Sequence, residues 1–140
     1  MKIEITNQQK IKKITFKALR AQIAKVCGCL EMGDVEISFL LCDDVFIQKL
    51  NKKFFKRDMP TDVIAFGLKD KGCFGEVIVS VERAVLAAPK YGNCWQDEFL
   101  TYVIHGILHV HGYTDGTSKS RAKMFKKQDE VFNFLANSPK

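Results

Sequence analysis

The sequence predicts an α+β domain in which one small mixed β-sheet packs against about five helices. Three observations support this class: short segments with alternating apolar residues, longer segments with apolar residues at helical spacing, and the order of these segments. Strands and helices alternate in the first part of the chain, two strands then follow each other, and three helices come last. The predicted order is therefore βαβαββααα.

Periodicity, together with residues that begin or end helices, predicts each element. Residues 2–6 and 34–41 alternate apolar and polar side chains, as half-buried strands do. Residues 10–28 carry apolar side chains at helical spacing among lysines, and Gly28 favours an end there. The predicted elements are a strand at 2–6, a helix at 10–28, a strand at 34–41, a helix from Asp43 or Asp44 to about Asn51 or Phe54, strands at 62–67 and 74–80 joined by a hairpin turn at 69–72, and helices at 81–90, 95–111 and 117–136.

The composition indicates a single domain spanning residues 1–140. Hydrophobic residues make up 46% and charged residues 27%, the balance of a folded globular protein. No apolar run approaches the ~20 residues of a membrane span, and the N-terminus has no signal-peptide core, so we expect a cytoplasmic protein. The five cysteines lack regular spacing, so we expect reduced, mostly buried thiols. A net charge of +6 favours an anionic partner, with RNA or DNA first.

All three histidines lie within seven residues, at His105, His109 and His111. His105 and His109 are four positions apart, so on a helix they share one face. Two neutral imidazoles at this spacing can hold a divalent metal, as on the metal-binding helix of metalloproteases. The alternative is that one or both are hydrogen-bonded core residues. The coincidence of helical spacing, a following turn and a carboxylate favours the metal.

A third metal ligand is expected from beyond this helix. Gly112 predicts its end, because glycine readily takes the left-handed C-terminal position. Asp115 then lies on a turn that can return a carboxylate to the metal, and we expect it to be the third ligand. His111 is the less favoured choice, because it projects about 200° away from His109 on a regular helix. As a further alternative, Asp115 is simply a turn residue.

The residue after His105 is Gly106. Zinc peptidases of the H-E-x-x-H type need a glutamate at this position as general base. Its replacement by glycine therefore argues against peptide hydrolysis by that mechanism.

Three segments also fit known motifs in the same order. They are Asp58–Phe66 (D-M-P-T-D-V-I-A-F), Gly75–Ser80 (G-E-V-I-V-S) and the histidine segment. These segments resemble the motifs D-x-P-T-D-V-L-S-F, G-D-I-V-I-S and H-G-x-L-H-L-x-G-Y-D-H of the YbeY family, single-domain bacterial endoribonucleases of ribosomal RNA maturation. The three histidines of the last motif bind a metal, usually taken as zinc. In that motif the matching residues are His105, Gly106, Leu108, His109, Gly112 and Tyr113.

The chain departs from this pattern at two places. The family's third histidine falls on Asp115, so the resemblance implies a site of two imidazoles and one carboxylate. Such a site suits zinc but also other metals, including iron. Phe55 stands where the family usually has an arginine implicated in RNA cleavage, and Lys56 and Arg57 lie beside it. We therefore expect His105, His109, Lys56 and Arg57 in catalysis, with activity weaker than is typical or dependent on a partner.

The stretch from Lys49 to Arg57 interleaves basic and aromatic residues. Such a pattern is typical of single-stranded nucleic-acid contacts, but for Phe54 and Phe55 we favour core packing at a helix end. A second basic run lies at Lys119, Arg121, Lys123, Lys126 and Lys127, where a solvated helix face and an RNA contact are about equally favoured.

The resemblance thus implies a zinc-dependent, single-strand-specific endoribonuclease that processes the 3′ end of 16S ribosomal RNA and contacts the small ribosomal subunit. The main alternative is a non-catalytic assembly factor that binds RNA or a ribosomal protein and has a structural or vestigial metal site. A metallohydrolase for another substrate is the third hypothesis.

Overall fold

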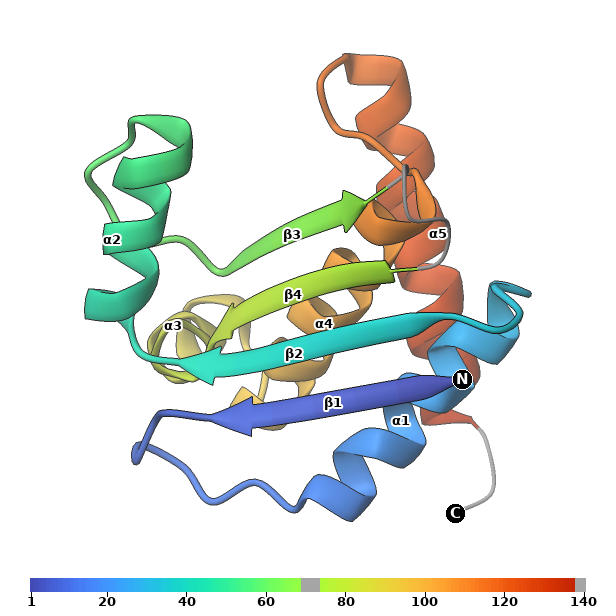
Figure 1. The fold of residues 1–140 in the computed structure, drawn as a ribbon, viewed down its shortest axis with the longest axis horizontal. Helices are drawn as coiled ribbons and strands as arrows, with labels where there is room; N and C mark the ends of the chain where they lie inside the picture. Colours follow the sequence, from blue (N-terminus) through green and yellow to red (C-terminus); the bar gives the residue numbers. More distant parts are fainter. Residues whose placement is uncertain (69–73, 138–140) are drawn as a thin grey trace.

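The computed structural model describes residues 1–68 and 74–137, and its elements follow the predicted order (Figure 1). The strands are β1 (Lys2–Asn7), β2 (Glu36–Cys42), β3 (Val63–Leu68) and β4 (Phe74–Ser80), and the helices are α1 (Phe16–Cys29), α2 (Asp44–Phe55), α3 (Val81–Ala87), a short 3-10 helix (Ala88–Tyr91), α4 (Trp95–His111) and α5 (Ser118–Ala136). The predicted α+β class is confirmed.

The sheet is mixed, with the strand order β1-β2-β4-β3. β1, β2 and β4 run parallel to one another, whereas β3 pairs antiparallel with β4 at the edge. The pairing of β3 with β4 agrees with the predicted hairpin, although its turn at 69–72 lies outside the described residues. β3 is thus an edge strand, and it borders the site described below.

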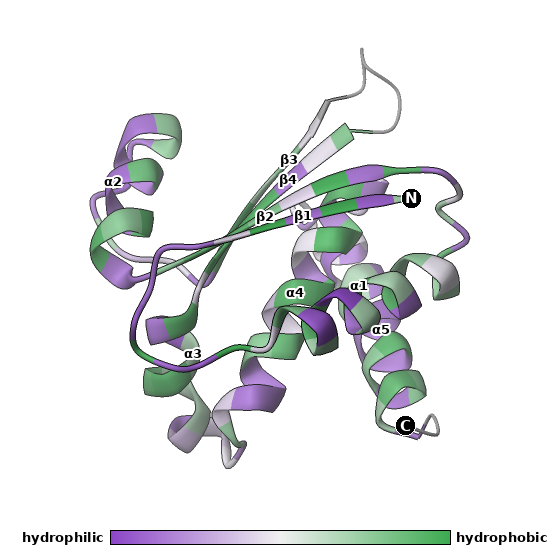
Figure 2. Cartoon of the chain, turned by 60° about the horizontal axis from the view of Figure 1, so that its bottom comes forward, coloured by the Kyte–Doolittle hydropathy of each residue, from purple (hydrophilic) through white to green (hydrophobic). Residues whose placement is uncertain are grey.

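The two faces of the sheet are covered differently. Ile37, Phe39 and Leu41 of β2 are buried in the main core with residues of α1, α4 and α5. Figure 2 shows these helices on one side of the sheet and α2 on the other. Because alternate residues of a strand point to opposite faces, Leu40 and Cys42 face α2 and pack with its smaller apolar cluster.

Helix α4 lies at the centre of the core, and a glycine allows its close approach to the sheet. Val103, Ile104, Ile107 and Leu108 are fully buried. A Cβ on Gly106 would lie 2.5 Å from the Val77 side chain of β4. The position after His105 therefore faces the sheet, which explains why a glycine stands where H-E-x-x-H peptidases carry a glutamate.

One predicted boundary is wrong. The first helix begins at Phe16, six residues after the predicted start at residue 10. The Gln9 side chain instead binds the backbone there: its Oε1 accepts from the N–H groups of Ile11 and Lys12, and its Nε2 donates to the Lys12 carbonyl. These local hydrogen bonds hold residues 10–12 in a loop, in competition with a helical turn.

The described cysteines are free thiols, as predicted, although only two of them are buried. Burial raises the pKa of Cys27 to about 11 and that of Cys42 to about 12, so both stay protonated at neutral pH. Cys29 is partly exposed and Cys94 is exposed. Cys73 lies outside the described residues.

Candidate metal centre

His105 and His109 lie one turn apart on the last part of α4, half-buried and facing the same side. Their Nε2 atoms are 3.2 Å apart, and their rings are nearly perpendicular, at 83°. The helix places them in this way because residues four apart share a face, and the burial of the neighbouring Ile104 and Leu108 fixes the orientation of that face.

The chain turns back immediately after this helix. Gly112 has a φ of 113° and donates its N–H to the His109 carbonyl, and the Tyr113 N–H donates to the Leu108 carbonyl. This left-handed cap ends α4 and redirects the chain. It brings Asp115 Oδ2 to 3.6 Å from His109 Nε2.

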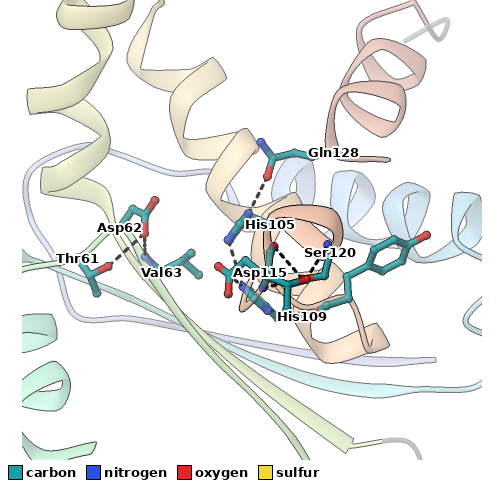
Figure 3. Close-up of polar contacts among 10 residues, drawn as sticks. Thr61, Asp62, Val63, His105, His109, Asp115, Ser120 and Gln128 are labelled. Carbon is teal, nitrogen blue, oxygen red and sulfur yellow. Dashed lines mark hydrogen bonds and ion pairs between the residues drawn. The ribbon is translucent and has the colours of Figure 1, made fainter. Parts of the chain in front are cut away.

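One ligand atom from each of His105, His109 and Asp115 lies within 4.8 Å of the others. Within residues 1–68 and 74–137, this is the one group of at least three such side chains close enough to hold a metal ion. Figure 3 shows the two imidazoles and the carboxylate turned toward one another. Tetrahedral zinc, with bonds of about 2.0–2.1 Å, separates two ligand atoms by roughly 3.3–3.4 Å. Two of the three separations are close to this value, at 3.2 Å between the two histidines and 3.6 Å between His109 and Asp115, and all three ligand atoms lie within 4.8 Å of one another.

The hydrogen bonds of the two imidazoles also fit a cation. His109 Nδ1 lies 3.2 Å from the Tyr113 carbonyl oxygen, and His105 Nδ1 lies 2.8 Å from Oε1 of Gln128. Both oxygens accept hydrogen bonds, so each neutral ring carries its proton on Nδ1 and its lone pair on Nε2. Two lone pairs and a carboxylate then face one point, an arrangement that repels itself unless a cation occupies the point.

The surroundings of His109 favour the neutral imidazole that a metal requires. Burial lowers its pKa below the ordinary value, and the proximity of His105 acts in the same direction. The carboxylates of Asp115 and Asp62 and the Tyr113 carbonyl oppose the shift but do not cancel it. Asp62 is held at the start of β3, where its carboxylate accepts from the Val63 N–H.

His111 is separate from this group. It is exposed at the end of α4, and its ring lies beside Tyr113, with 6.3 Å between ring centres. The structure therefore brings Asp115, the expected third ligand, to the two histidines and leaves out His111, the less favoured one.

A cleft of about 490 Å³ opens beside His109 and Asp115. Its far wall comes from the end of α2, the following loop and β3, with Phe55, Arg57 and Thr61 among the lining residues. Lys56, the other basic residue expected in catalysis, does not line the cleft; it caps α2 in the left-handed conformation, with a φ of 57°.

The sequence analysis did not predict the supporting roles of two residues at the site. Gln128 is buried on α5 between Met124 and Val131, and its position as a polar residue in an apolar stripe is the one signal that the sequence offers. Asn51 is buried at the cleft. Its side-chain amide donates to the Met59 carbonyl, and its backbone carbonyl accepts from the Arg57 N–H. Asn51 thus fixes the loop that carries Arg57.

Core packing was the wrong expectation for Phe54 and Phe55. Their relative exposures are 51% and 50%, because α2 lies at the margin of the sheet and its end projects beyond it. Both rings contact Phe66 of β3, with 5.3 and 6.2 Å between ring centres.

The second basic run forms the first three turns of α5. Lys119, Arg121, Lys123 and Lys126 are exposed, and Lys123 lies over the Tyr113 ring at 5.8 Å, beside the metal segment. Lys127 pairs with Glu130 at 3.6 Å. The run therefore flanks the site through Lys123.

Comparison with known proteins identifies a family of RNA-cleaving hydrolases. Residues 3–136 match the family model described as endoribonuclease YbeY. The endoribonuclease YbeY of Endomicrobium trichonymphae is 41% identical over 117 residues, covering 84% of this chain and 83% of that protein. That of Petrotoga mobilis is 38% identical and covers 96% of each chain. The chain therefore belongs to the YbeY endoribonuclease family, and the expected family and enzyme class are confirmed.

The fold agrees with this assignment. The solution structure of TM1509 from Thermotoga maritima superposes with a TM-score of 0.69 at 30% identity, covering 94% of this chain and 87% of that one. Among the helices that the structure describes, none combines the length and apolar character needed to cross a membrane.

Proposed function

We propose that this protein is a zinc-dependent endoribonuclease that cleaves single-stranded ribosomal RNA, at the 3′ end of 16S RNA, during maturation of the small ribosomal subunit. The observation that carries the proposal is the convergence of His105, His109 and Asp115 beside a cleft that Arg57 also lines. The match to the YbeY endoribonucleases and the net charge of +6 support an RNA substrate. Such a substrate places the reaction in the cytoplasm.

The proposed reaction divides the work between the two walls of the cleft. His105, His109 and Asp115 hold the ion, and Gln128 and the Tyr113 carbonyl keep both imidazoles in the liganding tautomer. When bound, zinc supplies a Lewis acid for a phosphate oxygen and lowers the pKa of a bound water. Arg57 binds the phosphate from the opposite wall, where its guanidinium can make paired hydrogen bonds with two oxygens.

The test measures zinc content and cleavage in the same preparations. Metal-stripped protein is assayed on a 16S RNA fragment before and after zinc is added, alongside His109→Ala and the matched control His111→Ala. We expect His109→Ala to lose the zinc and roughly 100- to 1,000-fold of the cleavage rate, the range for removing a group that stabilises transition-state charge. His111→Ala should retain both. Unchanged cleavage by His109→Ala would overturn the proposal.

A non-catalytic assembly factor is the second candidate, favoured by Asp115 in place of a third histidine. An anionic ligand leaves less positive charge on the ion and makes its bound water less acidic. This candidate predicts salt-sensitive RNA binding without zinc-dependent turnover. Asp115→His separates the two: a nuclease should shift the rising limb of its pH–rate profile to lower pH, whereas an assembly factor should show no cleavage to shift.

A further inference from the structure

An aromatic ridge, formed by the exposed Phe54 and Phe55 and the partly buried Phe66, stands between two hollows of the surface. Phe55 lines the cleft that contains His109. Phe54 lines a second hollow, of about 400 Å³, which lies over the face of the sheet that α1, α4 and α5 leave uncovered. The ridge is therefore continuous with the proposed active site on one side.

The geometry of the rings offers flat apolar surface to a ligand. The planes of Phe55 and Phe66 are within 7° of parallel, with centres 6.2 Å apart, and Phe54 meets Phe66 edge-on at 66°. The rings of Phe54 and Phe55 remain about half exposed although they touch Phe66. Exposed phenylalanine rings at a cleft cost free energy in water, which a stacked ligand would recover.

The charges around the ridge indicate the chemistry of that ligand. Between residues 49 and 58 the chain carries five cations, at Lys49, Lys52, Lys53, Lys56 and Arg57, against one carboxylate, Asp58. All six are exposed, and the Lys53 ammonium lies 5.4 Å from the centre of the Phe54 ring. An apolar protein segment would gain little from this charge, whereas single-stranded nucleic acid offers both flat bases and phosphates.

We infer that Phe55, supported by Phe66, stacks against one base of the single-stranded RNA and thereby positions the neighbouring phosphate at Arg57 and the metal centre. This inference deepens the proposed function and rests on it for the identity of the ligand. The ridge makes Phe55 a determinant of strand choice, because a base in a duplex is already stacked and unavailable to it.

The test is a double-mutant cycle that combines removal of the Phe55 ring with removal of a base of the RNA. Binding is measured on metal-stripped protein so that the RNA is not cut. Wild type, Phe55→Leu and Phe55→Trp are titrated with a single-stranded RNA of about ten nucleotides and with a series in which each position in turn is abasic. Tyr91→Leu serves as the control, because Tyr91 is also exposed, at 72%, but lies on the 3-10 helix and outside the lining of the cleft. Thermal melts confirm that each variant is folded.

We expect Phe55→Leu to weaken binding by roughly 5- to 150-fold, the range for loss of one aromatic–base stack, while Phe55→Trp and Tyr91→Leu keep the wild-type affinity. One abasic RNA in the series should weaken binding to wild type but have little further effect on Phe55→Leu, because ring and base then belong to one interaction. The inference would be overturned if wild type and Phe55→Leu bound RNA with equal affinity, or if each abasic position weakened binding equally in both proteins. The ridge would then be a contact surface for a protein partner.

The result of this binding test does not depend on whether the protein cleaves RNA. If ring and base are coupled but zinc-loaded protein does not cleave RNA, the stacking site stands and the nuclease proposal falls. If zinc-loaded protein cleaves RNA and no coupling is found, the reverse holds.

Discussion

The two walls of the cleft are built in different ways. The cleft wall formed by the end of α4 is half-buried, and the Nδ1 atom of each imidazole has an oxygen partner. Gly106 lets this helix lie close against the sheet. The α2 wall is exposed from Lys52 to Met59, and Asn51 is its buried anchor. The two imidazoles that must hold an ion at a fixed distance are supported by the core, whereas the third proposed ligand, Asp115, lies on an exposed turn. The residues proposed to meet a flexible strand lie on an exposed segment.

The largest expected effect tests how far the α4 wall depends on buried support. Gln128→Leu keeps the size of the side chain but removes the acceptor for His105 Nδ1. We expect a 10- to 100-fold loss of zinc affinity, the usual cost of removing a hydrogen-bond partner of a ligand, while the fold remains stable. Competition with a zinc chelator measures this. Gln96→Leu, at an exposed position of α4, is the control, and equal zinc affinities of the two variants would contradict the prediction.

The second prediction concerns the exposed wall and separates its two neighbouring cations. Arg57 lines the cleft and Lys56 does not. Arg57→Ala should lower kcat/KM about 10- to 100-fold, as expected for the loss of a charged hydrogen bond of about 1.5–3 kcal/mol. Lys56→Ala should change it less than about threefold, because an exposed charge outside the cleft is screened by salt. A larger loss of kcat/KM in Lys56→Ala than in Arg57→Ala would mean that Lys56, and not Arg57, binds the phosphate.

The sequence predicted those features of the cleft that depend on residues close together in the chain, and missed those that depend on contacts between distant segments. The spacing of His105 and His109 and the end of α4 at Gly112 are local, so the sequence predicted them. Gln128 was missed because it reaches His105 only when α5 packs on α4, which no local pattern reports. The exposure of Phe55 was mispredicted because an aromatic residue at a helix end is typical of a core, and only the position of α2 at the sheet margin contradicts this.

The start of α1 failed for a different reason. The apolar spacing of residues 10–28 is helical throughout, but Gln9 offers the backbone of Ile11 and Lys12 an alternative set of hydrogen bonds. Side-chain competition of this kind is local but does not appear in apolar periodicity. By contrast, the order β1-β2-β4-β3 arises from pairing between distant segments, which is why the sequence predicted a mixed sheet without its strand order.

A third prediction tests the close packing behind the α4 wall. Gly106→Ala would place a methyl group 2.5 Å from Cγ1 of Val77, a fully buried residue. Overpacking of about 1–3 kcal/mol exceeds the gain of up to about 1 kcal/mol from replacing a helical glycine, so the free energy of unfolding should fall by about 1–2 kcal/mol. Gly116→Ala is the control, because no heavy atom lies within 4 Å of the added Cβ. Urea titration measures both, and equal stabilities would show that α4 has room to shift.

The smallest expected effect concerns the backbone at the exposed end of α2. Lys56 holds a left-handed φ of 57° at the end of α2, a conformation that costs a residue with a Cβ about 1 kcal/mol and a glycine almost nothing. Lys56→Gly should therefore raise the free energy of unfolding by up to about 1 kcal/mol, less a contribution from the freer unfolded chain. Lys53→Gly, inside α2, should lower it by a similar amount.

Cleavage by the same two variants tests whether the side chain of Lys56 takes part in the reaction. Because Lys56 caps the helix and does not line the cleft, Lys56→Gly should be more stable and cleave RNA as well as the wild type does. A more stable variant that has lost activity would mean that the ammonium of Lys56, and not its backbone alone, serves the reaction. Lys56 would then both fix the backbone at the end of α2 and act in the reaction, as His109 is proposed to do at the end of α4.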